Sequence, residues 1–227
     1  MKKRILALLC ALGLITACPA CAAQGKGPEE DEVSSGAWVE TLYEDVVGDE
    51  WFAPAVAEVT RLGLMSGVEG GGFAPYREVN RATIVLVLWR MEGSPEAEMD
   101  DPFPDTEEWY ADAANWAKSV GIASGYGGVD PDHPAGSFGG RDSLTREQLA
   151  VFLYNYAKYK DEPIAEGMLG LYSDAFQISD WAETAVRHAV GMGILQGGDG
   201  GALDPKGVAN RAALAVMLHR MMTPAAG

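Results

Sequence analysis

Cysteine is scarce in this chain and is confined to its beginning. The 227 residues contain three cysteines, the last of which is Cys21. Disulfide bonds therefore play no part in stabilising the rest of the chain. Histidine is also scarce, and His133, His188 and His219 share no spacing typical of zinc ligands. The sequence thus predicts neither a metal site nor a cofactor.

Positive charge is the second shortage. Lysine and arginine number 17 against 33 aspartates and glutamates, which gives a formal net charge of −16. An acidic surface repels phosphate backbones, so the composition argues against a nucleic-acid partner. An anionic ligand would have to be held by local donors against this overall field.

Motifs for catalysis are missing as well. No Ser-His-Asp or Cys-His arrangement can be assigned, and no carboxylate pair stands in an apolar setting that would raise one pKa. The glycine-rich stretches 70–72 and 197–201 lack the Gly-Lys-Ser/Thr of a phosphate-binding loop. Asp199 and Asp204 lack the alternating carboxylates of an EF-hand. We therefore expect a protein without enzymatic activity.

A long apolar run occurs at the N-terminus. Basic residues 2–4 precede the run Ile5–Ile15, which is too short to span a bilayer permanently, so residues 1–22 are predicted to be an export signal. Two processing routes remain open. Leu14–Cys18 resembles a bacterial lipobox, which would place a lipid anchor on Cys18, and Ala20–Ala22 offers an ordinary cleavage site. The lipobox is favoured.

Residues 23–39 are predicted to form a flexible acidic tether. Within them, residues 24–36 lack apolar periodicity and carry four acids among glycine, serine and proline. Such a composition cannot bury enough apolar surface to fold by itself.

The remainder of the chain contains a threefold internal repeat, with units predicted at 40–98, 99–162 and 163–227. A spacing of 65 residues separates Leu88, Leu153 and Leu218. The same spacing separates the arginines Arg81, Arg146 and Arg211. Each unit also carries an acidic turn followed by a tryptophan; these residues are Asp45 and Trp51, Asp105 and Trp109, and Asp174 and Trp181. A fixed period of this kind is the signature of a repeat architecture.

Helical periodicity occurs twice in each unit. Apolar residues at three-and-four spacing mark the first helices at Val56, Val59 and Leu62, at Ala113, Trp116, Ala117 and Val120, and at Ala185, Val186, Ala189 and Val190. They mark the second helices at Ile84, Val85, Leu88 and Met91, at Leu149, Phe152, Leu153 and Tyr156, and at Leu214, Met217, Leu218 and Met221. The sequence therefore predicts six amphipathic helices, and no single helix pair can bury its own apolar stripe.

The predicted helix ends carry local signals. Thr145 and Gln148 form a capping-box pattern, and Asn80 and Asn210 occupy the equivalent N-cap position. The first helices are followed by glycines suited to a left-handed C-terminal position, Gly63, Gly121 and Gly193. Each aspartate of the acidic turns is expected to cap the helix that follows it.

This order of residues resembles the S-layer homology family. Repeats of that family run from an aromatic-x-Asp start through a tryptophan to a Thr-Arg-Ala-Glu-like motif that opens a second helix. Residues 103–105 with Trp109, and residues 145–148, are the closest matches, whereas Arg81 and Arg211 lack the following glutamate. The resemblance covers about residues 40–223. It implies an all-α fold in which three helix-loop-helix repeats form a pseudo-threefold trimer with grooves between neighbouring units.

The three arginines are the leading candidates for ligand contact. A guanidinium in the first turn of a helix presents a planar fork of donors beside free backbone N–H groups, which suits a carboxylate. The resemblance implies that these residues bind ketal-pyruvate or other acidic groups of a secondary cell-wall polysaccharide. In the alternative, each arginine pairs with the acidic turn of its own or the next unit. If Arg146 is a surface side chain, its replacement by alanine should lower the free energy of unfolding by less than about 0.5 kcal/mol.

Tryptophans and aspartates complete the candidate site. Trp51, Trp109 and Trp181 can each offer a flat face to a sugar ring, or they can fill gaps between units. The aspartates of the acidic turns are included as candidate ligand contacts beside their role as helix caps.

Together these features predict a non-catalytic cell-surface module. We expect it to be exported and to bind an acidic wall polysaccharide in the grooves, with a lipid on Cys18 tethering membrane to wall. The alternative is an envelope scaffold whose grooves bind another protein.

Overall fold

The structure is a computed structural model that describes residues 39–97, 101–127, 132–198 and 200–223. The predicted export signal, Cys18 and nearly all of the predicted tether lie outside the described residues. Among the described residues, no helix is both long and apolar enough to cross a membrane.

The described part of the chain is all-α. Its long helices are α2 (Ala53–Arg61), α3 (Arg81–Met91), α4 (Ala111–Ser119), α5 (Arg146–Tyr159), α6 (Glu183–Gly191) and α7 (Arg211–Met222). Three single-turn 3₁₀ helices accompany them, η1 (Val39–Thr41), η2 (Leu169–Leu171) and η3 (Ala175–Gln177). The described residues contain no strand, so the predicted all-α class with two helices in each unit is confirmed.

The second helix of each unit begins with the cap that the sequence predicts. Asn80 and Asn210 accept a hydrogen bond from the backbone three residues later, at Thr83 and Ala213. Thr145 and Gln148 form a complete capping box. Each cap satisfies an N–H that the helix itself cannot pair, which sets where the helix starts.

The ends of the first helices are also as predicted. Gly63, Gly121 and Gly193 have positive φ angles of 68°, 77° and 68°. Glycine adopts this left-handed conformation without the steric penalty that a Cβ atom brings, so the chain turns out of the helix at these positions.

The prediction that the acidic turns cap the first helices is wrong. The N-caps of α2, α4 and α6 are Phe52, Tyr110 and Ala182, and none of them makes a side-chain capping bond. The aspartates of the acidic turns have other partners, which lie 28 to 34 residues further along the chain.

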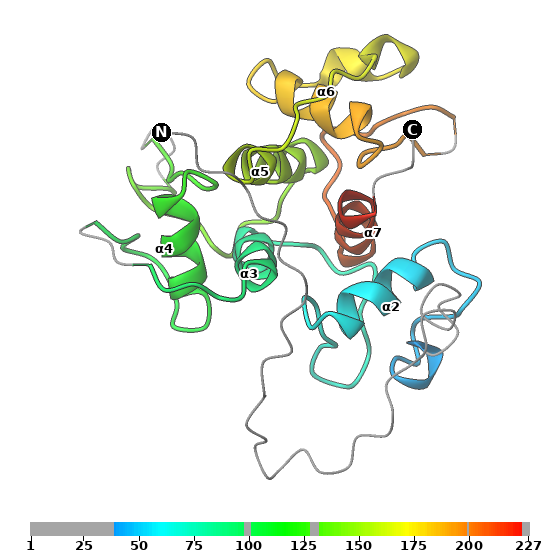
Figure 1. The fold of residues 1–227 in the computed structure, drawn as a ribbon, viewed down its shortest axis with the longest axis horizontal. Coiled ribbons are helices and arrows are strands. Elements are labelled where there is room, and N and C mark those ends of the chain that lie inside the picture. Colours follow the sequence, from blue (N-terminus) through cyan, green and yellow to red (C-terminus); the bar gives the residue numbers. More distant parts are fainter. Residues whose placement is uncertain (1–38, 98–100, 128–131, 199, 224–227) are drawn as a thin grey trace, which may run out of the picture.

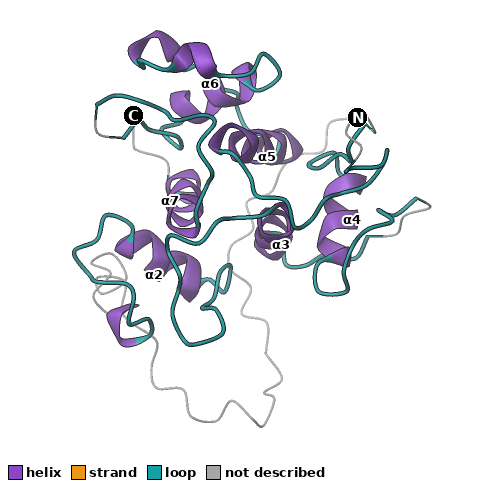
Figure 2. Cartoon of the chain, turned by 180° about the vertical axis from the view of Figure 1, so that it is seen from behind, coloured by secondary structure: helices purple, strands orange, loops and turns teal. Residues whose placement is uncertain are grey.

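Helices pack across unit boundaries. α3 of the first unit packs against α4 of the second, and α5 of the second unit packs against α6 of the third. α2 near the start of the described chain packs against α7 near its end, which closes the arrangement into a ring. In Figure 1, α3, α5 and α7 surround the centre and α2, α4 and α6 lie outside them; Figure 2 shows the same ring from behind. The predicted pseudo-threefold arrangement is confirmed.

A closed triangle of backbone hydrogen bonds joins the three units. The segments before the second helices contribute the equivalent residues Val79, Leu144 and Ala209, which are all buried. Val79 N–H donates to Ala209 (2.9 Å), Ala209 N–H to Leu144 (2.8 Å), and Leu144 N–H to Val79 (2.9 Å). Each unit therefore donates one of these bonds to one neighbour and accepts one from the other.

One continuous core joins the three units. It contains both helix stripes of every unit, including Val56, Leu88, Leu149 and Leu218. Leu62 is an exception to the predicted stripe, because it is the C-cap residue of α2 and its side chain is 43% exposed.

Candidate functional site

Each of the three arginines reaches from its own unit into a loop of the next unit. The Nε–H groups donate to the backbone oxygens of equivalent residues: Arg81 to Phe138 (2.7 Å), Arg146 to Leu203 (2.8 Å) and Arg211 to Phe73 (2.8 Å). The Nη2 groups donate to a second carbonyl in the same loop: Ser124 (3.0 Å), Gln196 (3.4 Å) and Ser66 (2.6 Å), respectively. The repeat thus places one guanidinium at each junction between units.

The acidic turns bind the other side of the same loops. The carboxylate oxygens of Asp174 accept from Leu203 N–H (2.8 Å) and Asp204 N–H (2.7 Å). Asp105 accepts in the same way from Phe138 and Gly139, and Asp45 from Phe73 and Ala74.

The arginine of one unit and the aspartate of the next are therefore connected through a single peptide group. In the third unit, the Leu203 oxygen faces Arg146 and the Asp204 N–H faces Asp174. Charge-assisted bonds on both sides of a peptide group strengthen each other through its polarisation. The residue after the peptide bond adopts a positive φ in all three units: 55° at Ala74, 65° at Gly139 and 52° at Asp204.

Among the described residues, no direct ion pair joins these arginines to the acidic turns. The predicted alternative of Arg–Asp pairing is therefore wrong in its geometry, since the two charges contact a common peptide group. Both carboxylate oxygens of each aspartate accept hydrogen bonds from the backbone. Contact of these aspartates with a ligand stays a prediction.

The expectation of free backbone N–H groups beside the arginines is wrong. Arg146 N–H donates to Gly207 O (2.9 Å) and Glu147 N–H to Pro205 O (3.0 Å), and the corresponding amides of α3 and α7 are paired in the same way. The N–H of the third residue in each of these helices donates to the N-cap side chain. The first turns therefore have no amide left for an anion. The side chains of the groove must supply the donors.

Glu147, which follows Arg146, has a structural role. Its side chain is buried and accepts from Ser179 N–H (3.0 Å), Ser179 Oγ–H (3.0 Å) and Lys206 Nζ (2.6 Å). The first and third units carry Ala82 and Ala212 at this position, so the junction between the second and third units has a tie that the others lack.

A cavity of about 570 Å³ opens at the junction that contains Arg146. Its polar lining consists of Arg146, Gln196, Asp204 and Arg220, and its apolar lining includes Met217 of α7. Trp51 lines the same cavity from the first unit, because α2 packs against α7. The indole is 60% exposed, so this tryptophan does not fill a gap between units.

Arg146 remains a cation in this cavity. Its pKa is lowered, because the effect of burial exceeds the opposite effect of the nearby carboxylates of Asp204 and Asp174. Since arginine starts from a pKa far above neutrality, the group keeps its positive charge at physiological pH. The cavity therefore has the positive guanidinium of Arg146 and the exposed aromatic face of Trp51 in one lining.

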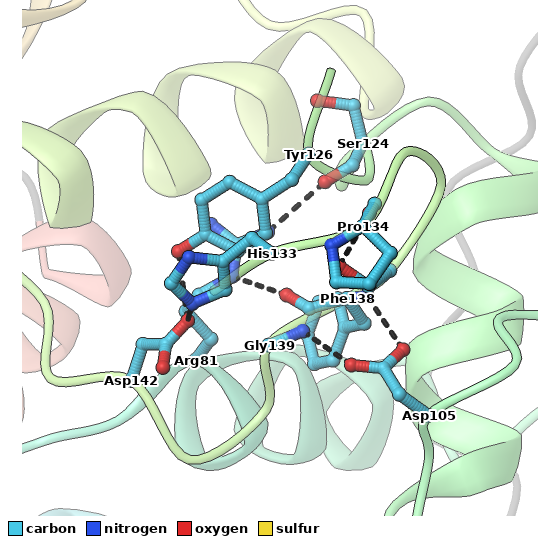
Figure 3. Close-up of polar contacts among 10 residues, drawn as sticks. Arg81, Asp105, Ser124, Tyr126, His133, Pro134, Phe138, Gly139 and Asp142 are labelled. Carbon is cyan, nitrogen blue, oxygen red and sulfur yellow. Dashed lines mark hydrogen bonds and ion pairs between the residues drawn. The ribbon is translucent and has the colours of Figure 1, made fainter. Parts of the chain in front are cut away.

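Aromatic side chains of the second unit lie against the guanidinium of Arg81, among them Tyr126 and Phe138 (Figure 3). The guanidinium carbon lies 5.0 Å from the ring centre of Tyr126, 4.9 Å from Phe138 and 5.4 Å from Phe152. Two contacts hold Tyr126 beside Arg81. Its ring stacks on His133 with 4.1 Å between the ring centres, and its hydroxyl donates to Asp142 (2.8 Å). His133 Nε2 lies 2.8 Å from the same carboxylate. His133 lies in the longest of the three equivalent loops, because Arg146 lies 21 residues after Gly125 and the corresponding distance in the other two units is 14 residues.

The remaining candidate tryptophans are also exposed. Trp109 is 51% exposed and Trp181 60% exposed, so neither fills a gap between units. Their contact with a ligand stays a prediction.

A second cavity, of about 580 Å³, lies within the second unit. Asp105, His133 and Arg141 line it, but Arg141 pairs with Glu107 (2.6 Å) and Asp105 is bonded to the backbone. No cluster of three or more potential metal ligands occurs among the described residues. The cavity at Arg146 therefore remains the strongest candidate site.

Sequence reasoning missed two features of these grooves. Arg220 was not singled out, although Arg90 and Arg220 are spaced by 130 residues, twice the repeat. Tyr126 and His133 were not connected with Arg81, because the stack forms across a loop and no spacing rule reports it.

Comparison with known proteins identifies two of the three units. A model of the S-layer homology domain matches residues 42–84 and 171–215, which belong to the first and third units. The middle unit is not among the matched residues, but it has the same two helices and the same Arg–peptide–Asp contacts.

Three relatives are similar to this chain over most of its length but over a small part of their own. The exoglucanase XynX of Acetivibrio thermocellus is 26% identical over 195 residues, which are 83% of this chain and 17% of that protein. Cell surface glycoprotein 1 of the same organism is 24% identical over 168 residues, 70% of this chain and 7% of that protein. The surface-layer 125 kDa protein of Lysinibacillus sphaericus is 26% identical over 171 residues, 73% of this chain and 14% of that protein. The chain thus spans less than a fifth of the length of these relatives.

The fold and the repeated junctions define a closed three-unit helical module. Its first and third units carry S-layer homology repeats, and the relatives that it resembles include two cell-surface proteins. It is a module of the cell-surface anchoring type, and a location at the cell surface or envelope is typical of proteins that carry it.

Proposed function

We propose that this module is non-catalytic and binds an acidic secondary cell-wall polysaccharide, for example a pyruvylated one, in the groove at Arg146. The observation that carries the proposal is the meeting of the Arg146 guanidinium and the exposed Trp51 indole in one cavity. A planar donor fork suits a carboxylate, and a flat indole suits the apolar face of a sugar ring.

The size of the cavity supports a small ligand segment. Pockets for small molecules commonly measure about 300–1,000 Å³, and the cavity at Arg146 falls within that range. One or two sugar residues of a longer polymer would occupy it, with the remainder of the polymer outside.

The three grooves are not equivalent in this proposal. Tyr126 and Phe152 cover the guanidinium of Arg81, so a ligand there would first have to displace this chain's own side chains. We therefore assign the main binding site to Arg146 and expect weaker binding at Arg81.

The test is co-sedimentation of the purified protein with bacterial wall sacculi before and after hydrofluoric-acid extraction of the secondary polymer. Binding should be lost after extraction and should be weakened by W51A. The matched control is F176A, which removes another aromatic side chain that is 83% exposed and lies outside the residues lining the cavity. Equal binding to extracted and intact sacculi would contradict the proposal.

The second candidate, a scaffold that binds a protein, is favoured by one observation. Met168, Leu171 and Phe176 of the third unit expose 68%, 71% and 83% of their surface. Exposed apolar side chains that form one contiguous patch mark protein-binding surfaces, and these three lie within nine residues of the chain. Retained binding to extracted sacculi, abolished by F176A, would favour this candidate.

The N-terminal part of the proposal concerns location. We propose that residues 1–22 direct export and that a lipid on Cys18 holds the module near the membrane while the groove binds the wall. Incorporation of labelled palmitate into the expressed protein, abolished by C18S, would support this step. A protein that carries no label with Cys18 intact would contradict it.

A further inference from the structure

A second guanidinium lies in the groove at Arg146. Arg220, in the last turn of α7, lines the same cavity. Its Nη1 group donates to the oxygen of Ile194 (3.4 Å), and the Nη2 group of Arg146 donates to the oxygen of Gln196 (3.4 Å). Residues two apart in a chain are separated by at most about 7 Å. The two guanidiniums therefore contact neighbouring points of one loop.

The two groups influence each other electrostatically. Burial is the main cause that lowers the pKa of Arg220, and the positive charge of Arg146 lowers it further. Among the described residues, neither arginine forms an ion pair with a carboxylate. Two guanidiniums and one carboxylate, that of Asp204, line the cavity, whereas Asp174 is bonded to the N–H groups of Leu203 and Asp204 and is not among the lining residues. The lining therefore carries an excess of positive charge in a chain whose formal net charge is −16.

The charge of Arg220 is not needed to fasten the helix to the loop. The equivalent position is Asn155 in α5, where the amide Nδ2 donates to the oxygen of Ile122 (3.1 Å). The equivalent position in α3 is Arg90, which donates to Leu64 O (3.1 Å). A neutral amide thus makes the same contact in the second unit, and the guanidinium in α7 adds a charge and further donors that the contact does not use.

We propose that the groove between Arg146 and Arg220 recognises a ligand segment with two negative charges. Either two acidic groups on neighbouring sugars or one doubly charged phosphate group would meet this requirement. Two closely placed cations repel each other, and a dianion removes that repulsion while it accepts charge-assisted hydrogen bonds from both. This inference rests on the proposed function, because it concerns the same groove.

The experiment follows the indole N–H signal of Trp51 by NMR in protein labelled with ¹⁵N at tryptophan, because Trp51 lines this cavity. The probes are acetate, succinate and inorganic phosphate at constant ionic strength and pH 8. Succinate should shift the signal at a concentration at least about tenfold lower than acetate, as expected for one additional charge-assisted contact. Comparison of succinate with phosphate tells whether two carboxylates or one phosphate group fits better.

The key variant is R220N, because the protein already holds asparagine at the equivalent position of α5. R220N should reduce the preference for succinate over acetate to about twofold, the ratio expected from having two carboxylates in place of one. R220K retains the charge and should keep most of the preference, which separates loss of charge from loss of fold. The matched control is R90N, the same substitution on α3, which should leave the response of Trp51 unchanged.

Equal midpoints for the three probes in the wild-type protein, or an unchanged preference in R220N, would overturn the inference. Its failure can be distinguished from failure of the proposed function. Sacculi that bind the wild-type protein and R220N equally well would reject only the two-charge site, whereas sacculi that do not bind the wild-type protein would reject polysaccharide binding itself.

Discussion

Arg146 and Asp174 bind opposite sides of the same peptide group. The Leu203 oxygen accepts from Arg146 Nε at 2.8 Å, and the adjoining Asp204 N–H donates to Asp174 at 2.7 Å. The same arrangement occurs at the other two junctions, so each unit's loop is held between its own carboxylate and its neighbour's guanidinium. The arginines consequently stabilise the junctions and also line the grooves.

Replacing Asp174 by alanine should destabilise the fold. The substitution leaves the N–H groups of Leu203 and Asp204 without their charged acceptor, and we expect a loss of about 2–4 kcal/mol in the free energy of unfolding. Urea denaturation followed by circular dichroism measures the change. D180A removes an exposed carboxylate of the same segment and should change stability by less than about 0.5 kcal/mol. Equal stability of the two variants would contradict the role assigned to Asp174.

Replacing Arg146 by alanine should also cost stability, in contrast to the estimate for a surface side chain. Arg146 is half-buried and donates to the loop of the third unit, so we expect a loss of about 1–3 kcal/mol. Thermal unfolding of R146A beside R141A tests this, because Arg141 is an exposed arginine whose partner Glu107 lies within its own unit. A melting temperature for R146A as high as that of R141A would show that the contact adds nothing.

Among the tryptophans, Trp51 should matter most for wall binding. W51A should weaken co-sedimentation with sacculi by about tenfold, as expected when a stacking contact of roughly 1.4 kcal/mol is lost. W181A should have a smaller effect. By the pseudo-threefold relation, Trp181 belongs to the groove of Arg81, which Tyr126 covers. Both side chains are 60% exposed, so the two variants are matched in burial. A larger effect of W181A would show that the groove at Arg81 is the main site.

Removing Tyr126 should uncover Arg81. In Y126A the guanidinium loses the ring at 5.0 Å, and the stack with His133 disappears. We expect Arg81 to react several-fold faster with phenylglyoxal, measured by mass spectrometry of the peptide that contains it. Arg211, at a different junction, is the internal reference in the same digest. An unchanged rate for Arg81 would mean that Tyr126 does not control access.

His188 should make the fold less stable in mild acid. Burial lowers the pKa of His188 below its usual 6.5, and its Nδ1 accepts from Ala165 N–H (3.1 Å), which requires this nitrogen to be unprotonated. Between the usual and the lowered pKa, the unfolded chain binds a proton that the folded protein does not. The stabilisation is therefore complete above pH 6.5 and is lost as the pH falls below it.

Urea denaturation of the wild-type protein and H188Q at pH 7.5 and pH 5.5 measures this effect. The difference in unfolding free energy between the two pH values should be smaller in H188Q, because glutamine does not titrate. A difference of the same size in both proteins would show that other groups cause the acid sensitivity.

Features that depend on short stretches of chain could be predicted from the sequence. Thr145 caps a residue three positions away, and Gly121 needs only its own φ angle, so both were evident from local residue types. The 65-residue spacing predicted that each unit repeats these signals. The family resemblance added the pseudo-threefold arrangement, which helical periodicity alone left open.

Contacts between distant segments could not be predicted in this way. Arg211 binds Phe73 across 138 residues, and Asp45 binds Phe73 across 28. Both aspartate and arginine side chains have many possible partners, and no local rule says which loop will lie beside them. For this reason the helix cap predicted at Asp45 is wrong, and the sequence carries no local signal that Arg220 lines a groove.

The sequence by itself determined the repeat, the six helices and their caps, because these depend on interactions within a few residues of each other. Only the tertiary structure decided that a peptide group lies between each arginine and aspartate, that Tyr126 covers Arg81, and that Arg146, Arg220 and Trp51 share one cavity. The physical reason is closure of the ring. Packing of α2 against α7 brings the first and third units together, so the cavity at Arg146 is lined by residues of all three units.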